Sequence, residues 1–274
     1  MNGVRVGTSL KTDIPALKAL WMQAFGDSDA CISAFFESVY TPESVFVLRE
    51  DGIVKAMASW LPETVCWSRK GWNAAYLYAV ATDESARGQG YCARLLAYAE
   101  SFLAPRGVKV LLLVPGEPSL RQYYGRHGYQ DFTAVDSLEA EAVRADGTAE
   151  AVEPPAYLEL REDFLASRAY VSCPVPVLAF QERLARLSGG GLIRIAQGER
   201  EGCACVAKDE AGRAVLYELL WPGDRLEGAS LAASFVGADR MLIRTPGEGA
   251  PFAMAKWLSG KPKLPAPYFG IALD

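Results

Sequence analysis

The segment that ends one strand-like run and begins the next helix has the residue types that bind phosphate. The strand-like run ends at Thr82, the basic glycine loop Arg87-Gly88-Gln89-Gly90 follows, and a helical pattern extends from Cys92 to Leu103. Free backbone N–H groups and the positive end of the dipole gather at a helix N-terminus, and glycines let a ligand approach the main chain closely. The segment therefore predicts a cradle for the pyrophosphate of a phosphorylated cofactor.

This loop must be positioned by the elements around it. Apolar spacing predicts helices over 14–25, with Asp13 as cap, and over 32–39. Strands are expected over 44–49, 53–61 and 74–82, the first two joined by the hairpin turn Asp51-Gly52. After the loop and its helix come an apolar strand over 108–114, a short helix from Ser119 that Gly128 ends, and a strand from Tyr129.

The spacing Gly88-x-Gly90-x-x-Ala93 also fits the dinucleotide fingerprint of a Rossmann unit. In that fingerprint the strand runs straight into the glycines, and an acidic residue lies about 20 residues further on. Here residues 83–87 intervene, and Glu117 lies well beyond that distance. Two helices and a hairpin upstream are also foreign to a chain that opens with a nucleotide-binding strand. We therefore reject an NAD site.

A second motif, Tyr123-Tyr124-Gly125-Arg126-His127-Gly128-Tyr129, follows the apolar strand. It is similar to the Phe-Tyr-x-x-x-Gly-Phe segment of the GCN5-related N-acetyltransferases (GNAT), and Arg87-Gly88-Gln89-Gly90 is similar to their loop. The first half thus resembles that superfamily, which acetylates amines with acetyl coenzyme A (acetyl-CoA). The resemblance implies an α/β (α+β) fold with a mixed, mostly antiparallel sheet flanked by helices.

The resemblance also implies how the acetyl donor is held. Backbone N–H groups of the loop and helix start bind the pyrophosphate, Arg87 adds charge, and the main chain of the preceding strand pairs with the pantetheine arm. Ser119, at the start of the short helix, is a further candidate contact or a helix N-cap. The expected cofactor-binding residues are Val80, Ala81, Thr82, Arg87, Gly88, Gln89, Gly90, Tyr91, Cys92, Ala93 and Ser119.

Acetyl transfer from a thioester needs a proton for the departing thiolate. Tyr124 occupies the tyrosine position of the resembled motif, and a phenol with a pKa near 10 is a suitable acid for a thiolate. A base for the amine is not marked by spacing: Glu63, Asp83 and Glu117 are candidates, and His127 is more typical of a surface position. Cys92 is interpreted as a helix residue rather than a nucleophile, because no second histidine or acid is placed to activate it.

The second half repeats the first in coarse order. Residues 140–155 read as a linker; a helix follows over 177–187, strands over 192–196, 203–208 and 214–221, a helix over 227–235, and strands over 240–244 and 268–273. Pro222-Gly223-Asp224 stands where the glycine loop would be. We predict a GNAT domain over 1–140 and a degenerate GNAT-like domain over 155–274 that has lost its cofactor site.

This arrangement is similar to the front two domains of the Eis-type acetyltransferases. In those relatives the terminal carboxylate serves as the base. If 268–273 is the last strand of the second half, Asp274 could serve in the same way, either through its side chain or through its α-carboxylate; the alternative is a frayed terminus.

Composition describes an ordinary soluble chain of 274 residues, half of them hydrophobic, with a net charge of −5. The mildly acidic charge balance argues against a nucleic-acid groove. No apolar stretch approaches the length of a membrane span and the N-terminus lacks the pattern of a secretory signal, so a cytoplasmic location is expected. The six cysteines form no CxxC pair and there is one histidine, so no metal site is expected. A homo-oligomer is compatible with this composition.

The sequence therefore predicts an N-acetyltransferase that acts on a primary amine of a small molecule by direct attack in a ternary complex. The alternative from another class is a module that senses acyl-CoA or an amine without turnover. Aromatic residues at helical spacing, namely Trp21, Phe25, Phe35, Phe36 and Tyr40, favour core packing over an acceptor pocket. Aminoglycoside, polyamine, amino acid and peptide amines all remain open as acceptors.

Overall fold

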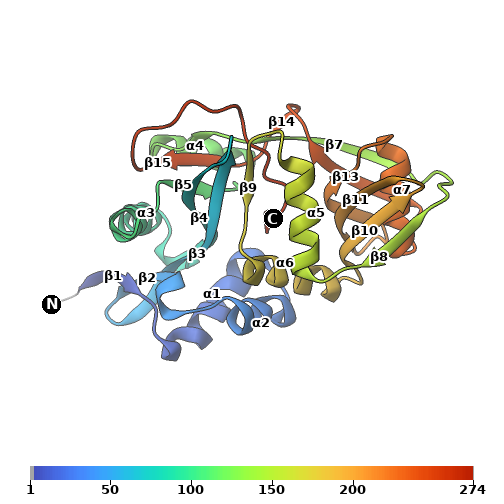
Figure 1. Ribbon diagram of the computed structural model, residues 1–274. Coiled ribbons are helices and arrows are strands. Elements are labelled where there is room, and N and C mark those ends of the chain that lie inside the picture. Colours follow the sequence, from blue (N-terminus) through green and yellow to red (C-terminus); the bar gives the residue numbers. More distant parts are fainter. Residues whose placement is uncertain (1–2, 274) are drawn as a thin grey trace. The chain divides into compact units, whose positions relative to one another are not determined.

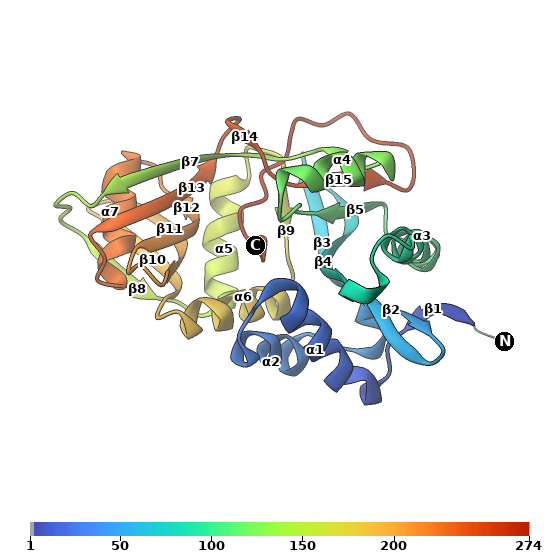
Figure 2. The same cartoon turned by 180° about the vertical axis from the view of Figure 1, so that it is seen from behind.

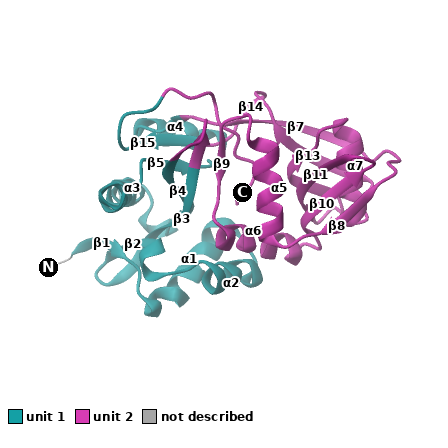
Figure 3. Cartoon of the chain, in the orientation of Figure 1, with its two compact units in different colours: residues 1–64, 72–130, 254–262 teal, residues 65–71, 131–253, 263–274 magenta. Residues whose placement is uncertain are grey.

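A computed structural model describes residues 3–273, which form two compact units (Figure 3). Unit 1 consists of Met1–Thr64, Trp72–Gln130 and Met254–Pro262, and unit 2 of Val65–Gly71, Asp131–Ala253 and Lys263–Asp274. Each unit therefore contains segments that are distant in the sequence.

Unit 1 is built on a mixed sheet with the strand order β1-β2-β3-β4-β5-β15-β6 (Figure 1; Figure 2 shows it from behind). The pairs β1–β2, β2–β3 and β5–β15 are antiparallel, whereas β4 and β5 are parallel and are joined through a helix. Its elements are β1 (Val4–Thr8), α1 (Ile14–Phe25), α2 (Asp29–Ser38), β2 (Val45–Glu50), β3 (Ile53–Trp67), β4 (Lys70–Thr82), α3 (Tyr91–Leu103), β5 (Val110–Leu113), α4 (Pro118–Arg126), β6 (Gln130–Asp131) and β15 (Met254–Trp257).

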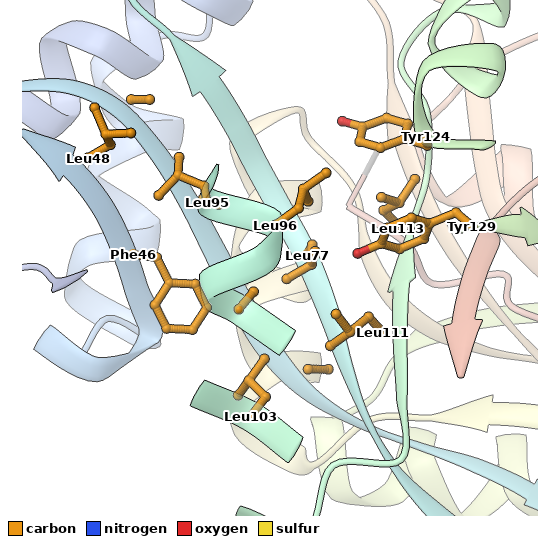
Figure 4. Packing of buried hydrophobic residues seen from close by; sticks show 14 of the residues in the cluster. Phe46, Leu48, Leu77, Leu95, Leu96, Leu103, Leu111, Leu113, Tyr124 and Tyr129 are labelled. Atoms are coloured by element: carbon orange, nitrogen blue, oxygen red, sulfur yellow. The ribbon is translucent and has the colours of Figure 1, made fainter. Parts of the chain in front are cut away.

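The core of unit 1 forms where α3 packs on the sheet (Figure 4). Leu95, Leu96 and Leu103 of α3 recur at helical spacing and are at most 1% exposed, so this face of the helix is completely buried. Strands β2, β4 and β5 supply the other side of the same cluster, including Phe46 and Leu111. This packing fixes the N-terminus of α3 relative to the end of β4.

Unit 2 repeats the element order of unit 1. Its sheet has the strand order β14-β7-β13-β12-β11-β10-β8, with β12 and β13 parallel and joined through a helix. Its elements are β7 (Ala134–Glu141), β8 (Thr148–Ala151), α5 (Pro154–Leu165), β9 (Tyr170–Ser172), α6 (Val175–Leu187), β10 (Gly191–Gln197), β11 (Arg200–Lys208), β12 (Ala214–Leu220), α7 (Arg225–Phe235), β13 (Arg240–Pro246) and β14 (Ala250–Pro251). The predicted fold class, with a degenerate second half, is confirmed.

The two sheets exchange a strand. In unit 1, the strand beside β5 is β15, which the chain reaches only after completing most of unit 2, and its Met254 pairs with Leu113. In unit 2, the strand beside β13 is β7, which directly follows the elements of unit 1. The compact units therefore differ from the predicted boundaries 1–140 and 155–274, because strand pairing cuts across the order of the sequence.

Most predicted elements of both halves are present. Several features differ from the prediction, since helix α5 and strands β9, β14 and β15 lie where no element was expected. The expected linker 140–155 contains β8, whose Ala149 pairs with Ile195 of β10. The segment 268–273 is not a strand. It forms a single isolated β-bridge, between Tyr268 and Tyr170. Strand β1 precedes the first predicted element and pairs with β2.

A buried ion pair lies at the centre of unit 2. Arg161 and Glu218 are 1% and 0% exposed, and Arg161 Nε donates to Glu218 Oε1 at 2.9 Å. The hydroxyl of Tyr157 donates to the same oxygen at 3.0 Å, and Arg161 Nη1 donates to the carbonyl of Val171 at 3.0 Å. The C-terminal segment closes over this pair, since a Cβ on Gly270 would lie 2.6 Å from Glu218 Oε2.

We expect the free energy of unfolding to fall as pH rises above about 9. Burial, and then the Glu218 carboxylate, raise the pKa of Cys203, Cys205, Tyr157 and Tyr268 above their usual values of 9.0 and 10.0. The unfolded chain then releases these protons while the folded chain keeps them, which lowers stability by about 1.4 kcal/mol per pH unit for each group. Urea unfolding between pH 8 and 10.5 measures this slope.

The variant Cys205→Ala is the control for this slope, because it removes one of the four protons and should make the fall with pH shallower. An unfolding free energy that stays constant from pH 8 to 10.5 would contradict the prediction.

Candidate functional site

The glycine loop places an open helix N-terminus beside the end of β4. Gly90 is the residue before α3 and has φ +76°, and no side chain within the described residues caps the helix. The first helical bond runs from the Arg94 N–H to the Gly90 carbonyl at 3.1 Å, so the N–H groups of Tyr91, Cys92 and Ala93 have no acceptor within the helix. These groups are available to a bound anion.

The two glycines keep this end accessible. Gly88 has φ +78° and Gly90 φ +76°, a backbone region that favours glycine. A Cβ at either position would meet no described atom within 4 Å, so the space beside the main chain is open. Arg87 is exposed, with its Nε donating to the Thr82 carbonyl at 3.4 Å and its guanidinium 3.7 Å from Glu84. The loop can therefore accept a phosphate at its main chain with a cation beside it.

Asp83 has a structural role in this loop. Its carboxylate accepts hydrogen bonds from the N–H and the hydroxyl of Ser85, and lies 3.6 Å from Lys55 Nζ. The hydrogen bond from the Ser85 hydroxyl is the main reason why the pKa of Asp83 lies below its usual value. A carboxylate of lowered pKa that holds a turn is poorly suited to accept a proton from an ammonium group.

The end of β4 separates from β5. The parallel register joins Ala74, Ala75 and Tyr76 to Val110, Leu111 and Leu112, and among the described residues it goes no further, although β4 continues to Thr82. Ala79 has φ +50°, an uncommon conformation for a residue other than glycine within a strand. The predicted residues Val80, Ala81 and Thr82 follow this irregularity, so their main chain is not committed to β5. The strained backbone at Ala79 could not be predicted from the sequence, because alanine does not mark a left-handed position.

The side chains at the start of α3 pack inward. Tyr91 is 5% exposed and belongs to the core of unit 1, so only its main chain faces the loop. Cys92 is half-buried, and burial raises the pKa of its thiol. The Tyr123 hydroxyl is hydrogen-bonded to this sulfur. A thiol of raised pKa is a weak nucleophile, which is consistent with the interpretation of Cys92 as a packing residue.

Tyr124 lies in the same core cluster as the start of α3. It is 7% exposed, and its ring centroid lies 5.4 Å from that of Tyr123 and 5.8 Å from that of Tyr129. Figure 4 shows its hydroxyl directed away from α4. Burial, followed by the nearby Cys92, raises the pKa of Tyr124 well above that of a free phenol, so the group is protonated at neutral pH. A protonated phenol in a dry site can donate its proton to a thiolate as that thiolate departs.

The other predicted residues are more scattered. Ser119 is exposed, and its hydroxyl donates to Glu117 Oε2 at 3.2 Å, which ties two candidates to each other at the start of α4. Glu63 is 5% exposed on β3, and His127 ends α4 with its ring 4.8 Å from that of Tyr123. Asp274 lies outside the described residues and stays a prediction as the base.

The predicted core packing of the first two helices is confirmed for Trp21 and Phe35 and is wrong for Phe25, which lies in the last turn of α1 and is 48% exposed. Trp21 is 2% exposed, and its ring lies 5.1 Å from Phe35 and 5.2 Å from Tyr78 of β4. The rings meet at steep angles, as in an ordinary aromatic core.

Unit 2 closes the equivalent helix end. Residues 221–224 join β12 to α7, and the carboxylate of Asp224 accepts hydrogen bonds from the N–H groups of Leu226 at 2.9 Å and Glu227 at 3.1 Å. The ring of Trp221 packs on the first turn of α7, since a Cβ on Gly228 would lie 2.5 Å from its Cγ. A protein carboxylate thus takes the N–H groups that α3 leaves open, as expected for a second half without a cofactor site.

Among residues 3–273, no three His, Cys, Asp or Glu side chains lie together as metal ligands would. The described helices include none with the length and apolarity of a membrane span.

Comparison with known proteins points to one family. Residues 5–131 match the family described as acetyltransferase (GNAT) domain. No curated protein sequence matches the chain.

Solved structures share the fold over nearly the whole chain. A GCN5-related N-acetyltransferase from Anabaena variabilis is 13% identical, with a TM-score of 0.74 over 94% of this chain and 73% of that one. Eis1 from Mycobacterium abscessus is 11% identical, with a TM-score of 0.65 over 93% of this chain and 74% of that one. A putative acetyltransferase from Pyrococcus horikoshii is 13% identical, with a TM-score of 0.63 over 97% and 92%.

Proposed function

We propose that this protein transfers an acetyl group from acetyl-CoA to a primary amine of a small molecule, because residues 5–131 match the acetyltransferase (GNAT) domain family. The observation that carries the proposal is the open N-terminus of α3, with its two left-handed glycines, in the same packed unit as the buried Tyr124. The main chain of residues 87–93 would hold the pyrophosphate of the donor. The end of β4 from Val80 to Thr82, which does not pair with β5, would receive its pantetheine arm.

The reaction proceeds by direct attack within a ternary complex. The neutral amine nitrogen forms a bond to the thioester carbon, the C–S bond breaks, and the electron pair goes to sulfur. Tyr124 gives its hydroxyl proton to the thiolate, and the nitrogen of the new amide loses a proton to solvent or to a base. Cys92 takes no part, because burial raises the pKa of its thiol and no covalent acetyl-enzyme is needed.

The activity test is release of free coenzyme A from acetyl-CoA in the presence of aminoglycosides, polyamines, amino acids and peptides. Amine-dependent thiol release supports the transferase. Binding of acetyl-CoA without thiol release from any of these amines would favour the sensor instead, and absence of acetyl-CoA binding would remove both functions.

The variant Gly90→Val should abolish the rise in melting temperature that acetyl-CoA causes in the wild type. A branched side chain at φ +76° strains the loop and projects into the open space from which a phosphate would reach the N–H groups of α3. Differential scanning fluorimetry with and without acetyl-CoA measures the effect.

Gly26→Val is the matched control for Gly90→Val. Gly26 has φ +73° at the end of α1, also with no described atom within 4 Å of a Cβ, so it shares the strain but not the site. It should lower the melting temperature and keep the acetyl-CoA response. Equal responses in the two variants would contradict a pyrophosphate site at the loop.

A further inference from the structure

Tyr129 carries a buried hydroxyl that the fold itself does not use. The residue is 2% exposed, and within residues 3–273 its hydroxyl has no hydrogen-bond partner. A buried polar group without a partner is costly, and a phenylalanine would fill the same space without that cost. The hydroxyl is therefore expected to serve a group or a water molecule that enters this part of unit 1.

The nearest candidate for a group that the Tyr129 hydroxyl could serve through hydrogen bonding is Tyr124. The two ring centroids lie 5.8 Å apart with an interplanar angle of 65°. Figure 4 shows both hydroxyls directed to the same side. The hydroxyl of Tyr124 comes from α4, and that of Tyr129 comes from the segment between α4 and β6. The two hydroxyls make no direct hydrogen bond with each other, so a link between them requires one bridging water.

The charged groups around Tyr129 are paired with each other. Lys256 of β15 passes over the chain next to Tyr129, since a Cβ on Gly128 would lie 3.2 Å from Lys256 Cε. Its Nζ donates to Glu100 Oε1 of α3 at 2.5 Å. Cys92 of α3 and Tyr123 of α4 form a side-chain hydrogen bond with each other. Among the titratable groups near Tyr129, Tyr124 is thus the one that belongs to neither of these pairs.

We propose that Tyr129 is a positioning residue whose hydroxyl donates a hydrogen bond to one buried water, which in turn donates to the oxygen of Tyr124. When Tyr124 gives its proton to the thiolate of coenzyme A, its oxygen becomes a phenolate in a dry site. The Tyr129 O–H bond stays intact and its hydrogen bond stabilises that negative charge until the phenolate takes a proton back from solvent. The inference rests on the proposed transferase function.

The environment of Tyr124 explains why such a donor matters. Burial raises the pKa of Tyr124, which makes the phenol a reluctant acid. A hydrogen bond donated to the ionised form favours that form and offsets part of this effect. Without it, transfer of the proton to sulfur becomes slower.

The test is Tyr129→Phe, measured alone and in the Tyr124→Phe background. The single variant should lower kcat by about 10- to 100-fold, as for loss of a hydrogen bond to a charged group, while KM for acetyl-CoA and the melting temperature are maintained. In the Tyr124→Phe background the same change should have almost no effect on kcat, because Tyr129 acts only through Tyr124. The solvent deuterium isotope effect on kcat should rise in the single variant.

The matched control is Tyr98→Phe. Tyr98 lies on α3 and packs against the same core through Phe46 and Phe102, away from the Tyr124 pair. It should leave kcat and the isotope effect unchanged.

Two outcomes would overturn the proposal: an unchanged kcat in Tyr129→Phe, or an equal loss in both backgrounds. A wild type without turnover would instead overturn the transferase function. A loss in Tyr124→Phe together with a silent Tyr129→Phe would remove only this inference.

Discussion

Replacing Tyr124 with phenylalanine is expected to lower kcat by about 10²- to 10⁴-fold, the usual contribution of a positioned general acid. The phenol is 7% exposed, and burial raises its pKa, so at neutral pH it holds the proton that the departing thiolate needs. Phenylalanine keeps the ring contacts with Tyr123 and Tyr129, so the fold and acetyl-CoA binding should be maintained. Steady-state kinetics together with the acetyl-CoA melting shift separate the two effects.

Tyr123→Phe is the control for that experiment. Tyr123 neighbours Tyr124 on α4, but its hydroxyl is bonded to the sulfur of Cys92. This variant should turn over at a rate close to that of the wild type. If both variants kept full turnover, the proton would have to reach sulfur from another group, and Tyr124 would be a packing residue.

A chain that ends at residue 253 is expected to lose the acetyl-CoA response, whereas one that ends at residue 262 should keep it. Both lack the last segment of unit 2, so the comparison isolates β15. Without β15, the apolar strand β5 becomes an unpaired edge, and the core of unit 1 loses Met254. The contact between Trp72 and Trp257 and the ion pair between Lys256 and Glu100 are lost as well.

Soluble yield, far-UV circular dichroism and the acetyl-CoA melting shift of the two shortened chains provide the measurement. Identical behaviour of both would mean that unit 1 holds its ligand loop without β15, and the strand exchange would then have no energetic role in the site.

The features that sequence predicted well are local. The α3 helix begins where the glycine loop indicated, because Gly88 and Gly90 specify left-handed turns and the apolar spacing of Leu95, Leu96 and Leu103 specifies a buried face. The candidate acid Tyr124 comes from a short motif; the structure shows that it is buried, and its role stays a prediction.

The features that sequence missed depend on distant segments. Nothing in Met254–Trp257 indicates that it pairs with β5 rather than with a neighbour in the second half, because four residues carry no information about a partner far away in the chain. Asp83 was a candidate base on proximity alone, but its hydrogen bonds to Ser85 become visible only with the loop folded. The unpartnered hydroxyl of Tyr129 is likewise a property of packing, since tyrosine and phenylalanine give the same pattern.

The exchange of β7 and β15 bears on how such a protein can be altered by recombination. The compact unit that carries the glycine loop is discontinuous, because residues 254–262 belong with residues before 131. A crossover anywhere between these segments separates β5 from its neighbour, so grafting the first half alone onto another protein should give an insoluble product. Most of unit 2, whose own helix end is closed by Asp224, lies between β5 and β15 in the chain, so these two paired strands are joined only through it.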